Sequence, residues 1–151
     1  MLSRFEQFSI AISGIYRSIQ KIERMEMAKY GLKGPHAQCL LAMKRYPEGI
    51  TATQLCEICD KDKAAVSRTL AELEAAELIR RSDPTGKRYR ANLQLTERGQ
   101  EIAENVNTLA YQAVKRATGG YDVQEREVFI GVLSIISSSL QDICREGLRQ
   151  G

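Results

Sequence analysis

The feature of this sequence that most constrains its fold is a pair of short helical segments separated by a tight turn, over residues 51–77. Thr51 and Gln54 have the three-residue spacing of a capping box, which predicts a first helix that ends at Cys59. A second helix is predicted from Lys63 to the end of the segment. Two short helices that meet at a tight turn are the outline of a helix-turn-helix.

The second helix of the pair has two different faces. Asp60 or Asp62 can cap its start, and Val66, Leu70 and Leu73 recur at the spacing of a buried stripe. Small and basic residues fall on or near the opposite side: Lys63, Ala64, Ser67 and Arg68. We therefore expect the start of this helix to be exposed and weakly cationic.

The residues that follow predict a β-hairpin. Apolar and polar residues alternate from Tyr89 to Leu95, which is typical of a strand with one buried face, and a turn is expected over 83–86. Residues 80–90 carry a net charge of +4, whereas the whole chain carries +3. The basic residues of this stretch are Arg80, Arg81, Lys87, Arg88 and Arg90. A hairpin with this charge is suited to contact a phosphate backbone.

Helical periodicity dominates the rest of the chain. Apolar residues recur every three or four positions, and no internal repeat is present. Helices are predicted over residues 2–30, 35–45, 97–117 and 122–149, with Thr96 and a capping box of Asp122 and Glu125 at the last two starts. The fold class we expect is mainly α with a small β-hairpin wing.

Composition excludes several classes of protein. No run of 18 apolar residues occurs, so we expect a soluble, cytoplasmic protein without a membrane partner. The single histidine, His36, argues against a histidine-based catalytic or zinc site, and we expect it to be an exposed polar or pocket-lining residue. No paired carboxylates, nucleophile-base set or glycine-rich phosphate loop is present. We therefore expect no enzyme, no cofactor and no metal.

The stretch DKAAVSRTLAELEAAELIRRSDP, followed by the strand and LTERG, resembles the MarR family of bacterial winged helix-turn-helix transcriptional regulators. The resemblance implies a winged helix-turn-helix DNA-binding domain over residues 31–96. It also implies a helical dimerisation region, formed by residues 1–30 and 97–149, in which the first and last helices of two chains intertwine. The expected function is sequence-specific binding of double-stranded DNA by a homodimer, as a repressor on an inverted-repeat operator.

The same resemblance assigns DNA contacts to positions of this chain. In the recognition helix these are Lys63, Ala64, Ala65, Ser67 and Arg68, and in the wing they are Lys87, Arg88 and Arg90. Glu77 departs from the family, which has glycine before the wing. Tyr89 and Lys87 stand where the family has an arginine and an aspartate, so the choice between Arg88 and Arg90 as the residue that enters the groove stays open.

Two further expectations concern ligands and thiols. The resemblance implies a small-molecule effector pocket between the dimerisation helices and the winged domain; its candidate lining is Tyr16, Met25, Tyr30, Met43 and Tyr111, and the alternative is that these residues are ordinary core. Cys56 and Cys59 form a CxxC inside the short helix, which we interpret as small buried hydrophobes, as we do Cys39 and Cys144. A thiol-responsive regulator that uses Cys56 and Cys59 is one alternative function. A winged-helix protein-interaction module that does not bind DNA is the other.

Overall fold

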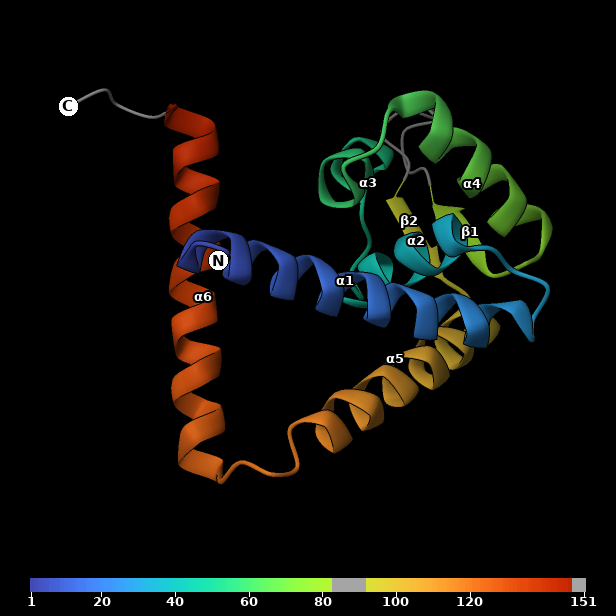
Figure 1. Cartoon of the computed structure of the whole chain (residues 1–151). Coiled ribbons are helices and arrows are strands. Elements are labelled where there is room, and N and C mark those ends of the chain that lie inside the picture. The colour runs from blue at the N-terminus through green and yellow to red at the C-terminus, as the bar shows by residue number, and fades with distance from the viewer. Residues whose placement is uncertain (83–91, 148–151) are drawn as a thin grey trace. The chain divides into compact units, whose positions relative to one another are not determined.

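The computed structural model describes residues 1–82 and 92–147 (Figure 1). In chain order the elements are α1 (Arg4–Ala28), α2 (Gly34–Lys44), α3 (Ala52–Cys59), α4 (Lys63–Ala75), β1 (Ile79–Ser82), β2 (Asn92–Leu95), α5 (Glu97–Ala117) and α6 (Val123–Glu146). The strands β1 and β2 pair antiparallel, with Ile79 opposite Leu95 and Ser82 opposite Asn92. The predicted fold class, mainly helical with one small hairpin, is confirmed.

Helix starts follow local sequence signals. Both predicted capping boxes are present: the Thr51 hydroxyl accepts a hydrogen bond from the Gln54 backbone N–H at 3.2 Å, and Asp122 caps α6 in the same way. A third capping box begins α1 at Ser3, so this helix starts at Arg4 and not at the predicted second residue. Each cap satisfies backbone N–H groups that the first helical turn leaves without a partner.

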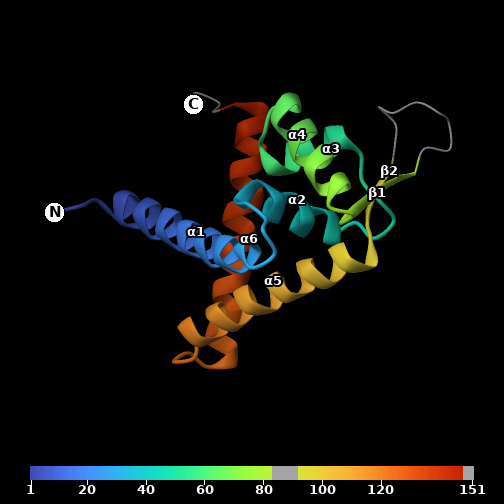
Figure 2. The ribbon, with the colours of Figure 1, turned by 90° about the vertical axis from the view of Figure 1, so that its right-hand side faces the viewer.

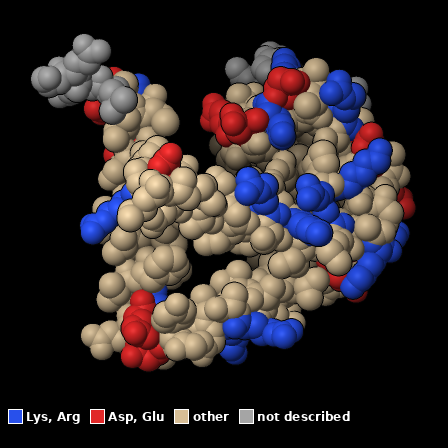
Figure 3. Space-filling model, in the orientation of Figure 1, with Lys and Arg blue, Asp and Glu red and all other residues tan. Residues whose placement is uncertain are grey.

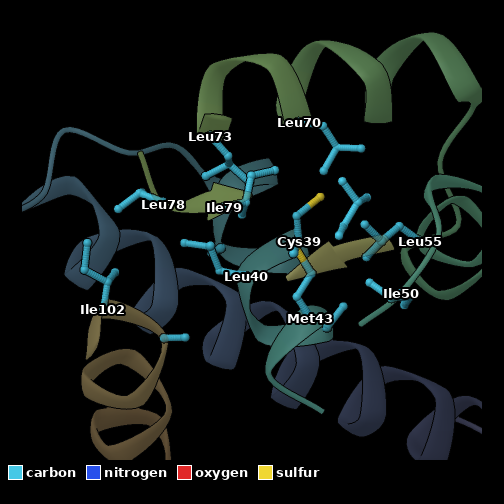
Figure 4. Close-up of a cluster of buried hydrophobic side chains, with 14 of the residues drawn as sticks. Cys39, Leu40, Met43, Ile50, Leu55, Leu70, Leu73, Leu78, Ile79 and Ile102 are labelled. Carbon is cyan, nitrogen blue, oxygen red and sulfur yellow. The ribbon is translucent and has the colours of Figure 1, made fainter. Parts of the chain in front are cut away.

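The hydrophobic core lies among α2, α3, α4, the hairpin and the adjoining ends of α1 and α5 (Figures 2 and 4). The predicted stripe of Val66, Leu70 and Leu73 is buried in it. In β2 Leu93 is buried, but Leu95 is only half-buried. The largest fully buried side chains are Met27, Leu40, Met43, Ile50, Leu55, Leu70, Leu73, Leu93 and Val106. One core thus supports both helices of the helix-turn-helix and the base of the hairpin.

The end of α4 is locked to the start of α5. The Leu78 N–H donates to the Leu73 carbonyl at 3.0 Å, which closes a Schellman motif, and Glu77 occupies its left-handed position with φ +58°. This is the position where glycine was expected from the resemblance. The hydroxyl of Thr96 donates to the Glu77 carbonyl at 2.8 Å and accepts from the Gly99 N–H, so Thr96 caps α5 as predicted. These bonds fix the hairpin base relative to α4.

Internal contacts divide the chain into a unit from Met1 to Tyr111 and a second unit that begins at Gln112. The predicted division, into a winged domain and two dimerisation segments, is by function and not by contacts within one chain. It stays a prediction. Many large apolar side chains are exposed on α1 and α6, among them Phe5 (75%) and Phe129 (50%). Among the described helices, α6 is also long and apolar enough, by length and composition only, to cross a membrane.

Candidate nucleic-acid interface

The start of α4 presents the side chains that the sequence assigned to nucleic-acid contact. Asp62, and not Asp60, is the N-cap: its carboxylate accepts from the Ala65 N–H at 2.7 Å. Lys63, Ala64, Ser67 and Arg68 are exposed, whereas Ala65 is half-buried. The first two turns therefore offer two cations, a hydroxyl and a small residue to a partner, with no bulky side chain in the way.

The opposite face of α4 is fixed. Besides its buried leucines, Thr69 is only 8% exposed, and its hydroxyl donates to the Ala65 carbonyl at 3.1 Å. The hairpin base adds a second attachment, because Arg81 of β1 pairs with Glu74 of α4 at 3.0 Å. The exposed face of α4 is thus carried by a helix that cannot rotate without breaking its packing.

A histidine also links α2 to α4. The His36 Nδ1 accepts from the Lys33 backbone N–H at 2.8 Å, so Nε2 carries the proton of the neutral ring and donates to the Glu72 carboxylate at 2.5 Å. The residue is 6% exposed and lines a cavity, so the expectation of a pocket-lining residue is confirmed and that of an exposed one is wrong. His36 is the third residue of α2, and a side chain at that position can accept a hydrogen bond from the backbone N–H of the N-cap residue, here Lys33. This spacing could have predicted the bond between the two residues.

The wing is only partly described. Lys87, Arg88 and Arg90, together with Tyr89, lie outside the described residues. Of the two basic residues in β1, Arg80 is exposed and donates to Gln94 at 3.3 Å. Arg81 is half-buried and pairs with Glu74, so it is less available to a phosphate than the exposed Arg80.

Two lysines that the sequence analysis did not single out lie beside the recognition helix. Lys33, which precedes α2, and Lys61, in the turn before α4, line a cavity of about 290 Å³ together with Arg68 and Glu72. Both lysines are exposed. Figure 3 shows Lys and Arg side chains distributed over one face of the unit from Met1 to Tyr111. Among the described residues, positive charge therefore lies beside the start of α4 on the α2 side.

The cysteine that interacts with Cys59 is not Cys56, its neighbour in the CxxC, but one from another helix. Cys56 and Cys59 pack against the core but are half-buried, and not buried as expected. The side chain that hydrogen-bonds to Cys59 is Cys39 of α2. That hydrogen bond, with Lys61 and Arg45 nearby, lowers the pKa of Cys59 to about 7. The same bond and burial raise the pKa of Cys39. Cys144 is exposed on α6 in this chain, so the expectation of a buried Cys144 is wrong for the single chain.

Comparison with a family model identifies the segment that carries this geometry. Residues 30–88 match the MarR family. The matched region runs from the α1–α2 connection through α4 and β1 into the wing, and it contains the exposed start of α4. The resemblance to MarR-family regulators is thereby confirmed. The comparison with curated proteins found no match.

Solved structures extend the similarity to most of the chain. A crystal structure of MarR is 25% identical, with a TM-score of 0.80, and the match covers 97% of this chain and 99% of that one. A MarR transcriptional regulator from Methanosarcina mazei Go1 is 22% identical, with a TM-score of 0.80 and coverage of 91% and 99%. The MepR–DNA complex of Staphylococcus aureus is 17% identical, with a TM-score of 0.71 and coverage of 92% and 99%. The chain therefore has the winged-helix fold of MarR-family transcription regulators.

Proposed function

We propose that the protein is a transcriptional repressor that binds double-stranded DNA in a sequence-specific manner, as a homodimer on an inverted-repeat operator. The observation that carries the proposal is the start of α4, which is capped, rigidly packed and covered with small and cationic residues. This helix stands in a fold similar to that of MepR, a regulator whose structure with DNA is known. A regulator, and not an enzyme, fits this arrangement.

The chemistry of the exposed residues suits the major groove. Arg68 can donate two hydrogen bonds to a guanine edge, Ser67 can donate to a phosphate, and Ala64 allows close approach and can touch a thymine methyl. Ala65 is half-buried and, like Ala64, is small enough to allow close approach. Lys63 and the wing residues Lys87, Arg88 and Arg90 add counterion release, which makes binding strongly salt-dependent.

The exposed apolar faces of α1 and α6 support the homodimer. Soluble proteins rarely leave rows of large apolar side chains in water, so these faces call for a covering chain. The exposed residues are Leu2, Phe5, Phe8, Ile12 and Ile15 on and beside α1, and Val128, Phe129, Val132, Ile135, Leu140 and Ile143 on α6. Two winged domains held by such an interface would place their recognition helices in successive major grooves, about one helical turn apart.

A dimer interface explains the apolar character of α6 better than a membrane does. Charged residues flank its central part, with Glu127 before it and Asp142 after it. The uncharged stretch between them is 14 residues long. At ~1.5 Å per residue it spans ~21 Å, which is shorter than the ~30 Å hydrocarbon core of a bilayer. We therefore place the protein in the cytoplasm with its operator.

Release of DNA by a small-molecule effector belongs to the same proposal and rests on the resemblance alone. Of the candidate pocket residues, Met43 is fully buried and Tyr30 packs against the core. These two fit the alternative interpretation, in which the candidate residues are ordinary core residues. Tyr16, Met25 and Tyr111 are exposed. An effector would therefore have to contact these three residues rather than Met43.

The proposal is tested by selecting sites from a library of random duplexes with the purified protein and sequencing the bound fraction. We expect one enriched motif with inverted-repeat symmetry, and binding of the best duplex that weakens steeply as salt is raised. No enriched motif and a flat salt response would contradict it. That outcome would favour the alternative of a winged-helix protein-interaction module.

A further inference from the structure

Cations from four separate segments lie on the α2 side of the recognition helix. The cavity of about 290 Å³ at the start of α4 is lined by Lys33, Lys61 and Arg68. A second cavity, of about 260 Å³, is lined by Lys61 and by Arg24 of α1. All four residues are exposed. Because Lys61 belongs to both linings, the cations form one row from α4 to α1, across α2, which packs against both helices and lies between them (Figures 1 and 2).

The charge of this row is largely unopposed. Among the described residues, no carboxylate forms an ion pair with any of its four cations. The two carboxylates that share the linings belong to Glu72, which already bonds to His36, and to Glu23, which is half-buried and whose pKa is raised by burial. Four cations and two carboxylates give the two linings a net charge of +2, against +3 for the whole chain.

The row is attached to the recognition helix through a buried side chain. The backbone N–H of Lys33 donates to His36 Nδ1 at 2.8 Å, and the other ring nitrogen donates to Glu72 of α4 at 2.5 Å. His36 is only 6% exposed, so water does not compete for these bonds. At the far end, the Arg24 stem lies across Gly34, where an added Cβ would be 3.0 Å from the Arg24 Cδ. The backbone that carries Lys33 is therefore held in register with α4.

A helix that enters the major groove of DNA has a phosphate backbone on each side of it. The groove is ~12 Å wide, and a helix with its side chains is ~10–12 Å across. Residues that flank such a helix are therefore brought against the phosphates at the groove edge. Lys33 and Lys61 flank α4 in this way, because they line one cavity together with Arg68.

We propose that Lys33, Lys61 and Arg24 bind phosphates of the same duplex that α4 reads, along one backbone of the major groove. This surface is continuous with the recognition helix through Arg68, and it is separate from the wing. Phosphate contacts of this kind add affinity and fix the position of the protein on the duplex, but they carry no base preference. The proposal rests on the proposed DNA-binding function.

Salt titrations on the duplex selected above count the phosphate contacts. Binding of the full-length protein is measured at several KCl concentrations for the wild type, Lys33→Ala, Lys61→Ala and Arg24→Ala. One phosphate contact contributes ~0.9 to the slope of log K against log[salt], so each variant of the proposed homodimer should lower the steepness by ~1.8. This corresponds to a roughly thirtyfold loss of affinity at about 0.15 M salt, equal for all base-substituted duplexes.

Matched variants separate a local contact from folding and from net charge. Lys33→Arg and Lys61→Arg keep the charge and should keep the wild-type slope. Lys29→Ala is the control, because Lys29 is also an exposed lysine but pairs with Glu26 and lines neither cavity. Its slope should equal that of the wild type, and circular dichroism checks that every variant is folded. An equal fall in slope for Lys29→Ala would reduce the effect to net charge and overturn the proposal.

Neutral methylphosphonates, placed at single positions along each strand, locate the contacts. A methylphosphonate at a phosphate that Lys33 binds should weaken binding of the wild type and have no further effect on Lys33→Ala, because the charge pair is already lost. The positions that depend on Lys33 and on Lys61 should lie on one strand of each half-site. Those that depend on Arg24 should lie farther from the base pair read by Arg68, because Arg24 lines only the second cavity.

The outcomes distinguish this proposal from the DNA-binding function on which it rests. Unchanged slopes in the three alanine variants, a loss confined to particular base pairs, or methylphosphonate effects that are the same in wild type and variants would overturn it, while the wild type still bound its operator. If the wild type binds no duplex, the DNA-binding proposal fails and this one fails with it.

Discussion

Replacement of Gly99 by alanine tests how tightly the start of α5 is held against the end of α4. Gly99 lies in the first turn of α5, where it is buried. A Cβ atom at this position would lie 2.0 Å from the carbonyl oxygen of Leu78, more than an ångström closer than ordinary contact. That oxygen accepts the Thr96 N–H at 3.0 Å, so it cannot withdraw without losing a backbone hydrogen bond. The overlap must therefore be relieved by moving α5 or the hairpin base.

The magnitude follows from three opposing contributions. Overpacking of a well-filled site costs about 1–3 kcal/mol. Weakening of the Thr96 bond adds about 1 kcal/mol, and the better helix propensity of alanine returns about 1 kcal/mol. We expect Gly99→Ala to lower the free energy of unfolding by about 2 kcal/mol, which corresponds to a fall in Tm of about 4–8 °C for a chain of this size.

Urea unfolding followed by circular dichroism measures the effect. Gly14→Ala is the matched control, because it makes the same change inside α1 where no atom lies within 4 Å of the added Cβ. The control should be unchanged or up to about 1 kcal/mol more stable. A Gly99→Ala variant as stable as the wild type would refute the packing described for α4, the hairpin base and α5.

Three more changes probe the winged domain. Glu77→Gly should stabilise the protein by about 1 kcal/mol in urea unfolding, because glycine adopts the left-handed backbone (φ +58°) without the cost that a side chain brings; an equal or lower stability would show that Glu77 is not strained. Asp62→Ala should lower the free energy of unfolding by about 1 kcal/mol, because α4 loses its cap. Asp62→Asn should keep most of that stability, because asparagine also caps helices. Equal losses in the two variants would show that the charge of Asp62 matters and not the cap. The alkylation rate of Cys59, followed by mass spectrometry, should rise with pH around a midpoint near 7, because the hydrogen bond from Cys39 lowers the pKa of Cys59 to about 7 and the thiolate is the reactive form. A midpoint at or above the ordinary cysteine value would contradict that hydrogen bond.

The parts of the fold that were predictable depend on local signals. The capping boxes at Thr51 and Asp122 are read from residues three positions apart, and the stripe of Val66, Leu70 and Leu73 from a helical period. In both cases the interacting residues lie close together in the chain and within one helix, so the sequence alone is enough to predict them. The exposed start of α4 follows directly, because a helix with one buried stripe must present its other side.

The parts that were missed depend on contacts between distant residues. The bond from His36 to Glu72 and the hydrogen bond between Cys39 and Cys59 join different helices, and no local pattern contains either pair. The ion pair of Arg81 with Glu74 was not predicted either, because the two residues lie on different elements. In each case the missing information was which helix faces which.

The most direct test of the account is the contribution of Arg68 to recognition. Arg68→Ala is compared with Arg116→Ala, which removes the same charge from the exposed end of α5, on the selected duplex and on variants with single base changes. We predict that Arg68→Ala costs about 1–3 kcal/mol of binding free energy and relaxes preference at one base position of each half-site, while Arg116→Ala has little effect. An equal loss in the two variants, or a loss from Arg68→Ala that is uniform across all duplexes, would contradict base recognition by the exposed face of α4.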